Sequence, residues 1–227
     1  MNSRSPLEKV PPLYQRAYEA LREALLQGEL KPGQRLTEAG VAEWLNISRT
    51  PVREAFRQLH REALLEVSHQ GRIRVPAIRK QDIHDFFECR TALETTAVAN
   101  AVLNAQDGDV DRLRRILELT EASSAAGDAA QVMHQNWLFH EFIIELSGNV
   151  RMLELLEHVW TRILLIRASI PRDPGMSRAL VGEHRRIFRA VEARDVGSAV
   201  EQLREHLKKA TGRYLTYLDD MGEATGE

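Results

Sequence analysis

The first sixty residues place apolar side chains at helical intervals, separated by short turns. Residues 13–26 carry apolar side chains three or four positions apart, which predicts a helix that ends at Gly28. A second short helix is predicted over residues 37–45, with Thr37 as its N-cap. A third helix is predicted directly after a tight connection, with Ser48 as its N-cap.

Alternating polarity replaces the helical period in residues 64–76. Apolar and polar positions alternate there on both sides of a turn at residues 69–71, which indicates a β-hairpin. Three helices followed by a hairpin is the order of a winged helix-turn-helix domain. We therefore assign residues 1–76 to such a domain, and residues 77–80 to a linker.

From residue 81 onward the pattern is helical and no strand signal occurs. Gly, Pro, Asn or Asp interrupts it at five places, which divides the region into six predicted helices. They span residues 81–104, 109–126, 128–147, 149–169, 177–194 and 196–218. Short connections predict an antiparallel all-α bundle over residues 81–220. The predicted fold class is therefore mainly α, with a small β-hairpin wing in the first domain.

The third predicted helix has two different faces. Arg49, Arg53 and Arg57 recur every four residues and lie along one face. Apolar residues suited to a core fall on the other face: Val52, Ala55, Phe56 and Leu59. A row of guanidinium groups on a rigid helix suits phosphates and guanine edges, which points to DNA. The alternative is a solvated charged face in which these arginines pair with Glu54 and Glu62.

The charge of the chain is distributed unevenly. Net charge is −2, yet residues 1–80 hold 14 Lys and Arg against 9 Asp and Glu, whereas residues 81–227 hold 17 against 24. A basic domain followed by an acidic one predicts different partners, although random variation is the alternative. No apolar run approaches the ~20 residues that span a bilayer, and the N-terminus lacks a signal-peptide pattern. We expect a cytoplasmic protein without membrane contact, whose single cysteine, Cys89, is a buried thiol.

Three segments of the first domain resemble the GntR family of transcription regulators. They are Pro32-Gly33-Gln34-Arg35-Leu36, Ser48-Arg49-Thr50-Pro51-Val52-Arg53-Glu54-Ala55 and Gly71-Arg72-Ile73-Arg74-Val75, in matching order and spacing. The second domain resembles the ligand-sensing FCD domain of the FadR branch. That resemblance is carried by Arg90-Thr91-Ala92-Leu93-Glu94, Phe139-His140, Ser147-Gly148-Asn149, Glu183-His184 and His206.

The resemblance implies a homodimeric repressor that binds a palindromic double-stranded operator and releases it when a small molecule binds the second domain. It implies that the third helix contacts the major groove, that Arg35 contacts a phosphate, and that Gly71 lies at the wing tip. The implied DNA-binding set is Arg35, Ser48, Arg49, Thr50, Pro51, Arg53, Arg57 and Gly71. Within this set we expect Arg53 to read a base. Gly40 stands where relatives carry a longer residue, so we expect one phosphate contact to be missing.

Three of the eight histidines are candidates for a metal site. His140 lies four residues after Asn136, so the two side chains share a helix face, and His184 and His206 lie on two later helices. A bundle can bring these residues together, and three imidazoles with one oxygen donor can hold a divalent ion. Ligand type does not decide between zinc, nickel and manganese. The alternative is an ordinary core or surface histidine, which we expect at five positions: His60, His69, His84, His134 and His158.

The resemblance implies the same ligand set with one change. FCD relatives that bind metal use one Asp and three His, and Asn136 stands at the Asp position in this chain. An amide oxygen can coordinate a metal ion but brings no negative charge. We therefore expect weaker metal binding, or binding that requires an acidic effector.

Arg90 is the candidate for recognition of a carboxylate-containing effector. It can hold the effector's carboxylate beside the metal, or it can pair with Glu94, four residues later. Few buried cations are expected in a bundle, because an unpaired one is costly. Three aromatic residues could line the same pocket, but their helical spacing is more typical of a core: Trp137, Phe139 and Trp160.

Two other functions are compatible with these residues. Three histidines with an open coordination position can activate water, as in a metal-dependent enzyme with a DNA-binding appendage. No carboxylate is placed as a general base, because Glu141 points away from His140 on the same helix, and we expect no enzyme activity. A second domain that only dimerises is the other possibility, and it predicts a filled apolar core.

Overall fold

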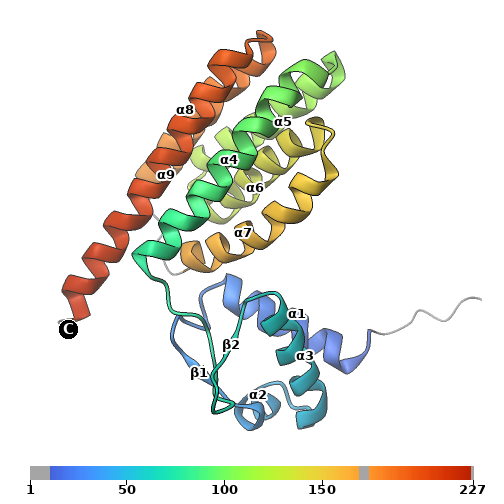
Figure 1. Cartoon of the computed structure of the whole chain (residues 1–227), viewed down its shortest axis with the longest axis vertical. Coiled ribbons are helices and arrows are strands. Elements are labelled where there is room, and N and C mark those ends of the chain that lie inside the picture. Colours follow the sequence, from blue (N-terminus) through green and yellow to red (C-terminus); the bar gives the residue numbers. More distant parts are fainter. Residues whose placement is uncertain (1–10, 169–173, 226–227) are drawn as a thin grey trace, which may run out of the picture. The chain divides into compact units, whose positions relative to one another are not determined.

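The computed structural model describes residues 11–168 and 174–225, and the chain divides into two compact units between Ile78 and Arg79 (Figure 1). The fold is mainly α with a small antiparallel sheet, which confirms the predicted fold class. In the described part of the chain, no helix is long and apolar enough to cross a membrane.

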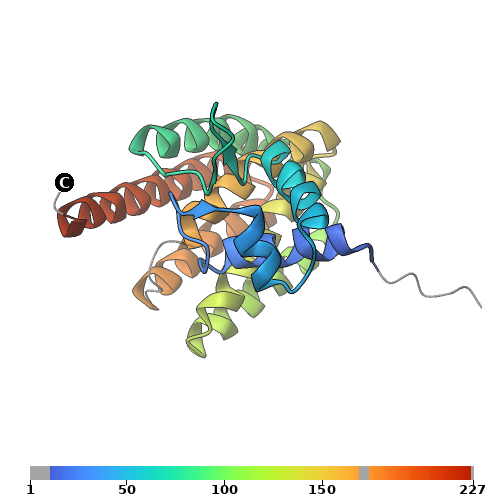
Figure 2. The same cartoon turned by 90° about the horizontal axis from the view of Figure 1, so that it is seen from below.

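The N-terminal unit contains three helices and a three-stranded sheet (Figure 2). The helices are α1 (Leu13–Leu26), α2 (Glu38–Trp44) and α3 (Arg49–Arg61), and the strands are β1 (Arg35–Leu36), β2 (Glu66–Val67) and β3 (Ile73–Arg74). The strand order is β1-β3-β2, so the expected hairpin of β2 and β3 is present and β1 extends it. The sequence pattern did not reveal that third strand, because two residues are too few to show alternation.

The core of this unit forms where α1 packs against α3. Each helix buries one apolar face completely, including Leu21 and Leu25 from α1 and Val52, Phe56 and Leu59 from α3. The arginine side of α3 therefore has to face away from the core. Burial of the opposite face thus fixes the direction in which the charged side chains point.

The two N-caps in this unit behave differently. Thr37 caps α2, since its hydroxyl oxygen accepts a hydrogen bond of 3.1 Å from the backbone N–H of Gly40. Ser48 occupies the N-cap position of α3, but its side chain makes no capping hydrogen bond. Capping by the Ser48 hydroxyl is therefore not part of what holds α3 in place.

The C-terminal unit is a bundle of helices within the described residues. They are α4 (Lys80–Asn104), α5 (Asp107–Ala125), α6 (Ala129–Leu146), α7 (Val150–Ala168), α8 (Pro174–Glu192) and α9 (Val196–Thr225). The expected end of the fourth bundle helix at residue 169 and most of the expected break at residues 171–175 lie outside the described residues. α9 continues beyond the expected end at residue 218.

Helix α4 runs through the bundle and packs against α6, α7 and α9, while α5 contacts α6 and α8. Where α4, α6 and α7 meet, Trp160 packs with Ala97, Ile144 and Leu156. The ring of Trp137 meets that of Trp160 edge-on, with centroids 4.6 Å apart. Trp160 and Phe139 are core residues, whereas Cys89 is exposed, so the expected burial of that thiol is wrong.

Candidate functional site

Helix α3 presents its arginines to solvent. Arg49, Arg53 and Arg57 are all exposed, whereas the apolar residues of the opposite face are buried. A helix with one buried face and one cationic face can lie along a polyanion without unfolding. This arrangement has the geometry that a DNA-contacting helix requires.

Two of the three arginines already have acidic partners. Arg53 donates from Nε and Nη2 to the two carboxylate oxygens of Glu38 on α2, at 2.8 and 2.9 Å. Arg57 donates from Nη1 to Glu54 at 2.8 Å, which is the pairing expected for a solvated face. Glu62 instead accepts a hydrogen bond of 2.7 Å from Tyr18. Burial and this hydrogen bond raise the pKa of Tyr18 to about 12.

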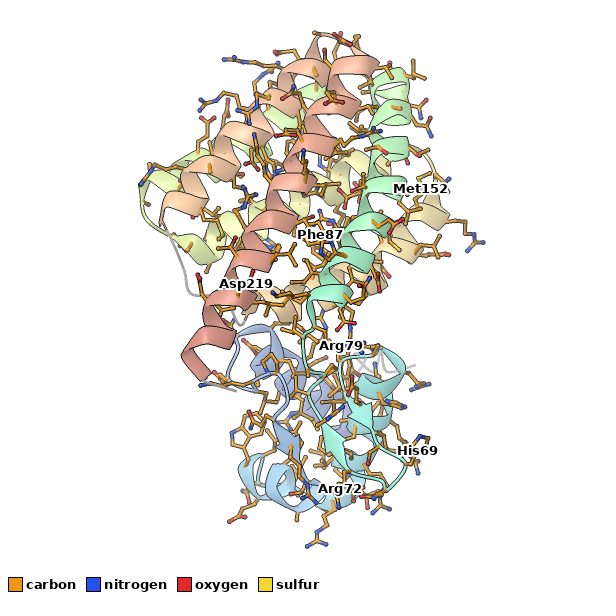
Figure 3. All side chains as sticks on the ribbon, turned by 60° about the vertical axis from the view of Figure 1, so that its left-hand side comes forward. His69, Arg72, Arg79, Phe87, Met152 and Asp219 are labelled. Atoms are coloured by element: carbon orange, nitrogen blue, oxygen red, sulfur yellow. The ribbon has the colours of Figure 1, made fainter. Side chains whose placement is uncertain are left out.

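The wing, which is the hairpin of β2 and β3, carries a further exposed arginine, Arg72, directly after its turn glycine. Gly71 adopts a φ of +71°, which a residue with a Cβ rarely adopts, and the Ser68 hydroxyl accepts hydrogen bonds from the backbone N–H groups of Gln70 and Arg72. Figure 3 shows Arg72 near the tip of this hairpin. Sequence reasoning missed Arg72 as a DNA-contacting candidate, although its place beside the turn glycine was a usable signal. Arg72 and Arg35 are exposed and have no ion-pair partner among the described residues.

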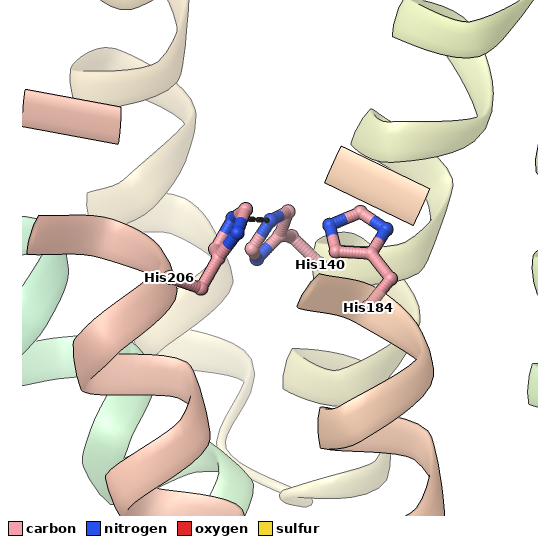
Figure 4. Close-up of side chains that lie close together, drawn as sticks. All are labelled: His140, His184 and His206. Atoms are coloured by element: carbon pink, nitrogen blue, oxygen red, sulfur yellow. Dashed lines mark hydrogen bonds between the residues drawn. The ribbon is translucent and has the colours of Figure 1, made fainter. Parts of the chain in front are cut away.

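The helical unit brings three histidines from three helices to one point (Figure 4). His140 comes from α6, His184 from α8 and His206 from α9, and their candidate ligand atoms all lie within 4.8 Å of one another. Each imidazole is at least 96% buried, since none exposes more than 4% of its surface. Three converging buried imidazoles form a site that could hold a divalent transition-metal ion.

Two glutamates orient two of these rings. Oε2 of Glu183 lies 2.7 Å from Nδ1 of His206. Oε2 of Glu94 lies 2.8 Å from Nδ1 of His140, close enough for an ion pair though not aligned as a hydrogen bond. The Glu183 carboxylate favours the His206 tautomer that carries its proton on Nδ1, so Nε2 of His206 keeps a lone pair. Nε2 of His140 lies 3.2 Å from it, within hydrogen-bond distance (Figure 4), and a metal ion bound here would replace this contact by taking a lone pair from each ring.

His184 is the histidine of the cluster that has the fewest polar contacts. It is fully buried, and within residues 11–168 and 174–225 neither of its ring nitrogens has a hydrogen-bond partner. Its ring stacks on Phe139 with centroids 4.1 Å apart, which fixes its orientation. Burial, reinforced by the fields of His206 and His140, holds the pKa of His184 well below its usual range. A neutral imidazole with two unpaired nitrogens costs stability unless something binds it, and a metal ion fits that requirement.

The charges around the cluster are arranged in matched pairs. Arg90 donates to Glu94 at 2.7 Å, and Arg213 donates to both oxygens of Glu183 at 2.9 and 3.1 Å. Burial alone would raise the pKa of Glu94, but Arg90 and His140 outweigh it and hold that pKa below its usual range. Burial likewise opposes ionisation of Glu183, yet His206 and Arg213 lower its pKa to about 2. Both carboxylates are therefore ionised at neutral pH.

A cavity of about 40 Å³ adjoins the histidine cluster. Because one water needs about 10–15 Å³ of such space, the cavity has room for a few small groups. Arg90, Asn136, His206 and Arg213 contribute its polar lining, and Met133, Met176, Leu180, Ala210 and Tyr214 complete it. Arg90 and Asn136 thus line the same cavity, and Arg90 also makes the alternative pairing with Glu94.

Sequence reasoning missed Arg213, Glu94 as a partner of His140, and Glu183 as a partner of His206. Arg213 lies seven residues after His206, so helical periodicity places both on one side of α9, which was an available signal. The two glutamates belong to other helices than the histidines they contact, so no spacing within one element indicates them. Trp137, Phe139 and Trp160 do not line the cavity.

Comparison with known sequences identifies the family. The profile of bacterial regulatory proteins of the gntR family matches residues 13–75, and that of the FCD domain matches residues 85–209. The chain belongs to the FCD-type GntR transcription regulators. Its first matched segment contains the α3 arginines and its second contains all three clustered histidines.

Relatives of the chain are regulators of the same kind. It is 29% identical to the HTH-type transcriptional regulator YdhC of Bacillus subtilis, over 88% of this chain and 90% of that protein. It is 35% identical to McbR of Escherichia coli over 63% of this chain and 65% of McbR. The solved structure of McbR covers 91% of this chain and 99% of its own with a TM-score of 0.76, at 28% identity. These relatives are transcription regulators and not enzymes, which agrees with the absence of enzyme activity expected from the sequence.

A further solved structure shares the fold of the helical unit. It is described as the metal-free FCD domain of TM0439, with a TM-score of 0.55 and 22% identity, and it covers 63% of this chain. The absence of metal is a property of that solved domain. For this chain, the histidines His140, His184 and His206 remain a group that could hold a metal ion.

Proposed function

We propose that this regulator is a repressor that binds a palindromic operator as a homodimer and releases it when a small organic acid binds, together with a divalent metal ion, in the cavity beside the histidine cluster. The observation that carries the proposal is His184, a fully buried imidazole whose two nitrogens have no hydrogen-bond partner among the described residues, beside two other buried imidazoles. A domain that only dimerises is expected to have a filled core in which every buried polar group is hydrogen-bonded. Such a core would not contain a buried imidazole without hydrogen bonds.

The proposed metal site uses His140, His184, His206 and Asn136 as its protein ligands. A bound zinc, nickel or manganese ion would supply positive charge that attracts a carboxylate. Asn136 lines the same cavity as His206, and it lies four residues before His140 on α6. All four donors are neutral, so the protein provides no negative charge of its own directly at the metal. This neutrality favours an anionic effector that completes the site.

Arg90 and Arg213 are the proposed anchors for that effector. Both line the cavity, and each is held in place by a buried carboxylate, Glu94 or Glu183. A guanidinium group retains free N–H donors after one such pairing and can share them with a second carboxylate. Nonpolar side chains, among them Met176 and Leu180, complete the wall and exclude water from the contact.

The proposed DNA interface comprises the α3 arginines, the wing and β1. Arg35, Arg49, Thr50, Arg53, Arg57 and Gly71 retain the roles that the family resemblance implies, with Ser48 and Pro51 at the start of α3. Arg72 joins them because it is exposed beside the wing turn. Two copies related by a two-fold axis would match a palindrome, since each copy would contact one half-site. A ligand that favours one arrangement of the two copies would then change operator affinity.

Metal analysis of the purified protein tests the sensing part of the proposal. We expect about one zinc, nickel or manganese ion per chain after incubation with each metal and removal of the excess, and loss of that ion in His140→Ala and His184→Ala. His134→Ala is the matched control, because His134 lies on the same helix as His140 and is exposed. Metal-free wild-type protein after all three incubations would refute the metal site and leave the DNA-binding part untouched.

Operator binding is tested separately with duplexes selected from a random pool by the wild-type chain. We expect the selected sequences to be palindromic, and two chains to bind each duplex in analytical ultracentrifugation. Addition of small mono- and dicarboxylates with metal should weaken binding of wild-type protein and not of Arg90→Ala. Selected duplexes without two-fold symmetry, or one chain per duplex, would refute the homodimer.

A further inference from the structure

Among the ion pairs described in the N-terminal unit, that of Arg53 with Glu38 uses both carboxylate oxygens. Arg57 contacts Glu54 on its own helix through one nitrogen, a common surface pairing. Arg74 contacts only one oxygen of Glu66 on the neighbouring strand. Arg53 instead donates two parallel hydrogen bonds, from Nε at 2.8 Å and Nη2 at 2.9 Å, to a carboxylate on another helix. Such a two-point contact fixes the plane of the guanidinium group as well as its position.

The position of Glu38 is itself fixed by the start of α2. Glu38 follows Thr37, whose hydroxyl accepts from the backbone N–H of Gly40 and so holds the first turn in place. The side chain of Glu38 is 28% exposed and that of Arg53 is 53% exposed, so the pair lies at the surface and Arg53 is the more exposed partner. Hydrogen bonds from Arg53 lower the pKa of Glu38, which keeps the carboxylate ionised.

The donors that this contact leaves free determine what Arg53 can recognise. A guanidinium group has five N–H donors. Glu38 takes the one on Nε and one on Nη2, which leaves the two on Nη1 and the second on Nη2. The free edge of the group is therefore the Nη1–Nη2 edge, which can donate to two acceptors at once. O6 and N7 of guanine present two acceptors at a matching spacing in the major groove.

We propose that Glu38 is a positioning residue for base recognition, an inference that rests on the DNA interface proposed above. Glu38 holds Arg53 side-on, so that only the Nη1–Nη2 edge of the guanidinium group faces the DNA and pairs with a guanine. Glu38 also offsets the charge of Arg53. That offset reduces the attraction of Arg53 to phosphates at every sequence, since non-specific affinity follows net charge. Arg35, Arg49 and Arg72 form no ion pair within the described part of the chain, and they supply the sequence-independent attraction.

Glu38→Gln in the full-length chain tests the proposal, with duplexes selected by the wild-type protein and single-base variants of them. We expect discrimination at one guanine per half-site to fall roughly tenfold, because a fixed two-point contact becomes mobile. Affinity for an unrelated duplex should rise, because a negative charge has been removed. Glu43→Gln is the matched control: it removes the same charge from an exposed position of α2 that makes no ion pair in the described structure.

A double mutant separates positioning from a general structural effect. In the Arg53→Ala background, Glu38→Gln should produce no further loss of discrimination, since Glu38 acts through Arg53. Equal losses in both backgrounds would overturn the proposal. So would a uniform loss at all base positions, unchanged discrimination in Glu38→Gln, or a wild-type chain that selects no preferred duplex.

Discussion

Acidification of the metal-free protein should destabilise the helical unit in a pH range where few other groups change charge. Burial lowers the pKa of His206 from 6.5 to about 4, although Glu183 opposes the shift. The unfolded chain therefore binds a proton that the folded chain excludes, and the free energy of unfolding falls as the pH drops below 6.5 and continues to fall until about 4. Between neutral pH and about pH 5 this one group costs about 2 kcal/mol. His184 adds a loss of the same sign.

Urea titrations followed by tryptophan fluorescence would measure this loss. Trp44 belongs to the other unit, so a Trp44→Phe background leaves only Trp137 and Trp160, both in the helical bundle. His206→Gln should reduce the pH dependence by about 2 kcal/mol over the same range. His134→Gln, at an exposed position on α6, should leave it unchanged.

The buried carboxylates do not obscure this result. The pKa values of Glu94 and Glu183 are lowered from 4.5, so their stabilising contribution is complete above pH 4.5 and is lost only below it. Equal free energies of unfolding at neutral pH and near pH 5 would refute the reasoning. Retention of the full pH dependence in His206→Gln would refute its assignment to that histidine.

Two further substitutions address the other parts of the molecule. Arg49→Ala should weaken binding to selected and unrelated duplexes alike and reduce the salt dependence of log affinity by about one unit, as measured by fluorescence anisotropy. A loss confined to the selected duplex would instead make Arg49 a base-reading residue. Glu94→Gln should destabilise the helical unit by about 3–5 kcal/mol in urea titrations, because it leaves Arg90 buried without its counter-charge. Glu154→Gln, in an exposed pair, is the control, and a comparable loss there would contradict the argument.

The fold was predictable from the sequence because its determinants are local. The apolar side of α3, with Val52 and Phe56 four residues apart, already fixed which face would be buried. Gly71 marked the turn of the wing, and its positive φ explains why the pattern broke there. Strand β1 was missed because it has two residues and its pairing with β3 depends on contacts far along the chain.

Only those parts of the candidate site that follow from residue spacing within one helix could be predicted from the sequence. Asn136 and His140 share a face by spacing, so their proximity follows from one helix. The contact of His140 with Glu94 joins α6 to α4, and that of Arg53 with Glu38 joins α3 to α2. Such contacts depend on how two helices pack, and a single sequence does not contain that information in any periodic form.

A series of side-chain contacts around the histidines begins and ends at residues that line the same cavity. Its members, in order, are Arg90, Glu94, His140, His206, Glu183 and Arg213. It runs from Arg90 on α4 to Arg213 on α9, and these are the two longest helices described, with 25 and 30 residues. Arg90 lies about 15 Å along α4 from Lys80, the first residue of that helix. A tilt of roughly 10° about Arg90 would move the first turn of α4 by about 3 Å, given the rise of a helix. A small displacement at a cavity of about 40 Å³ would therefore become a larger one at the first turn of α4.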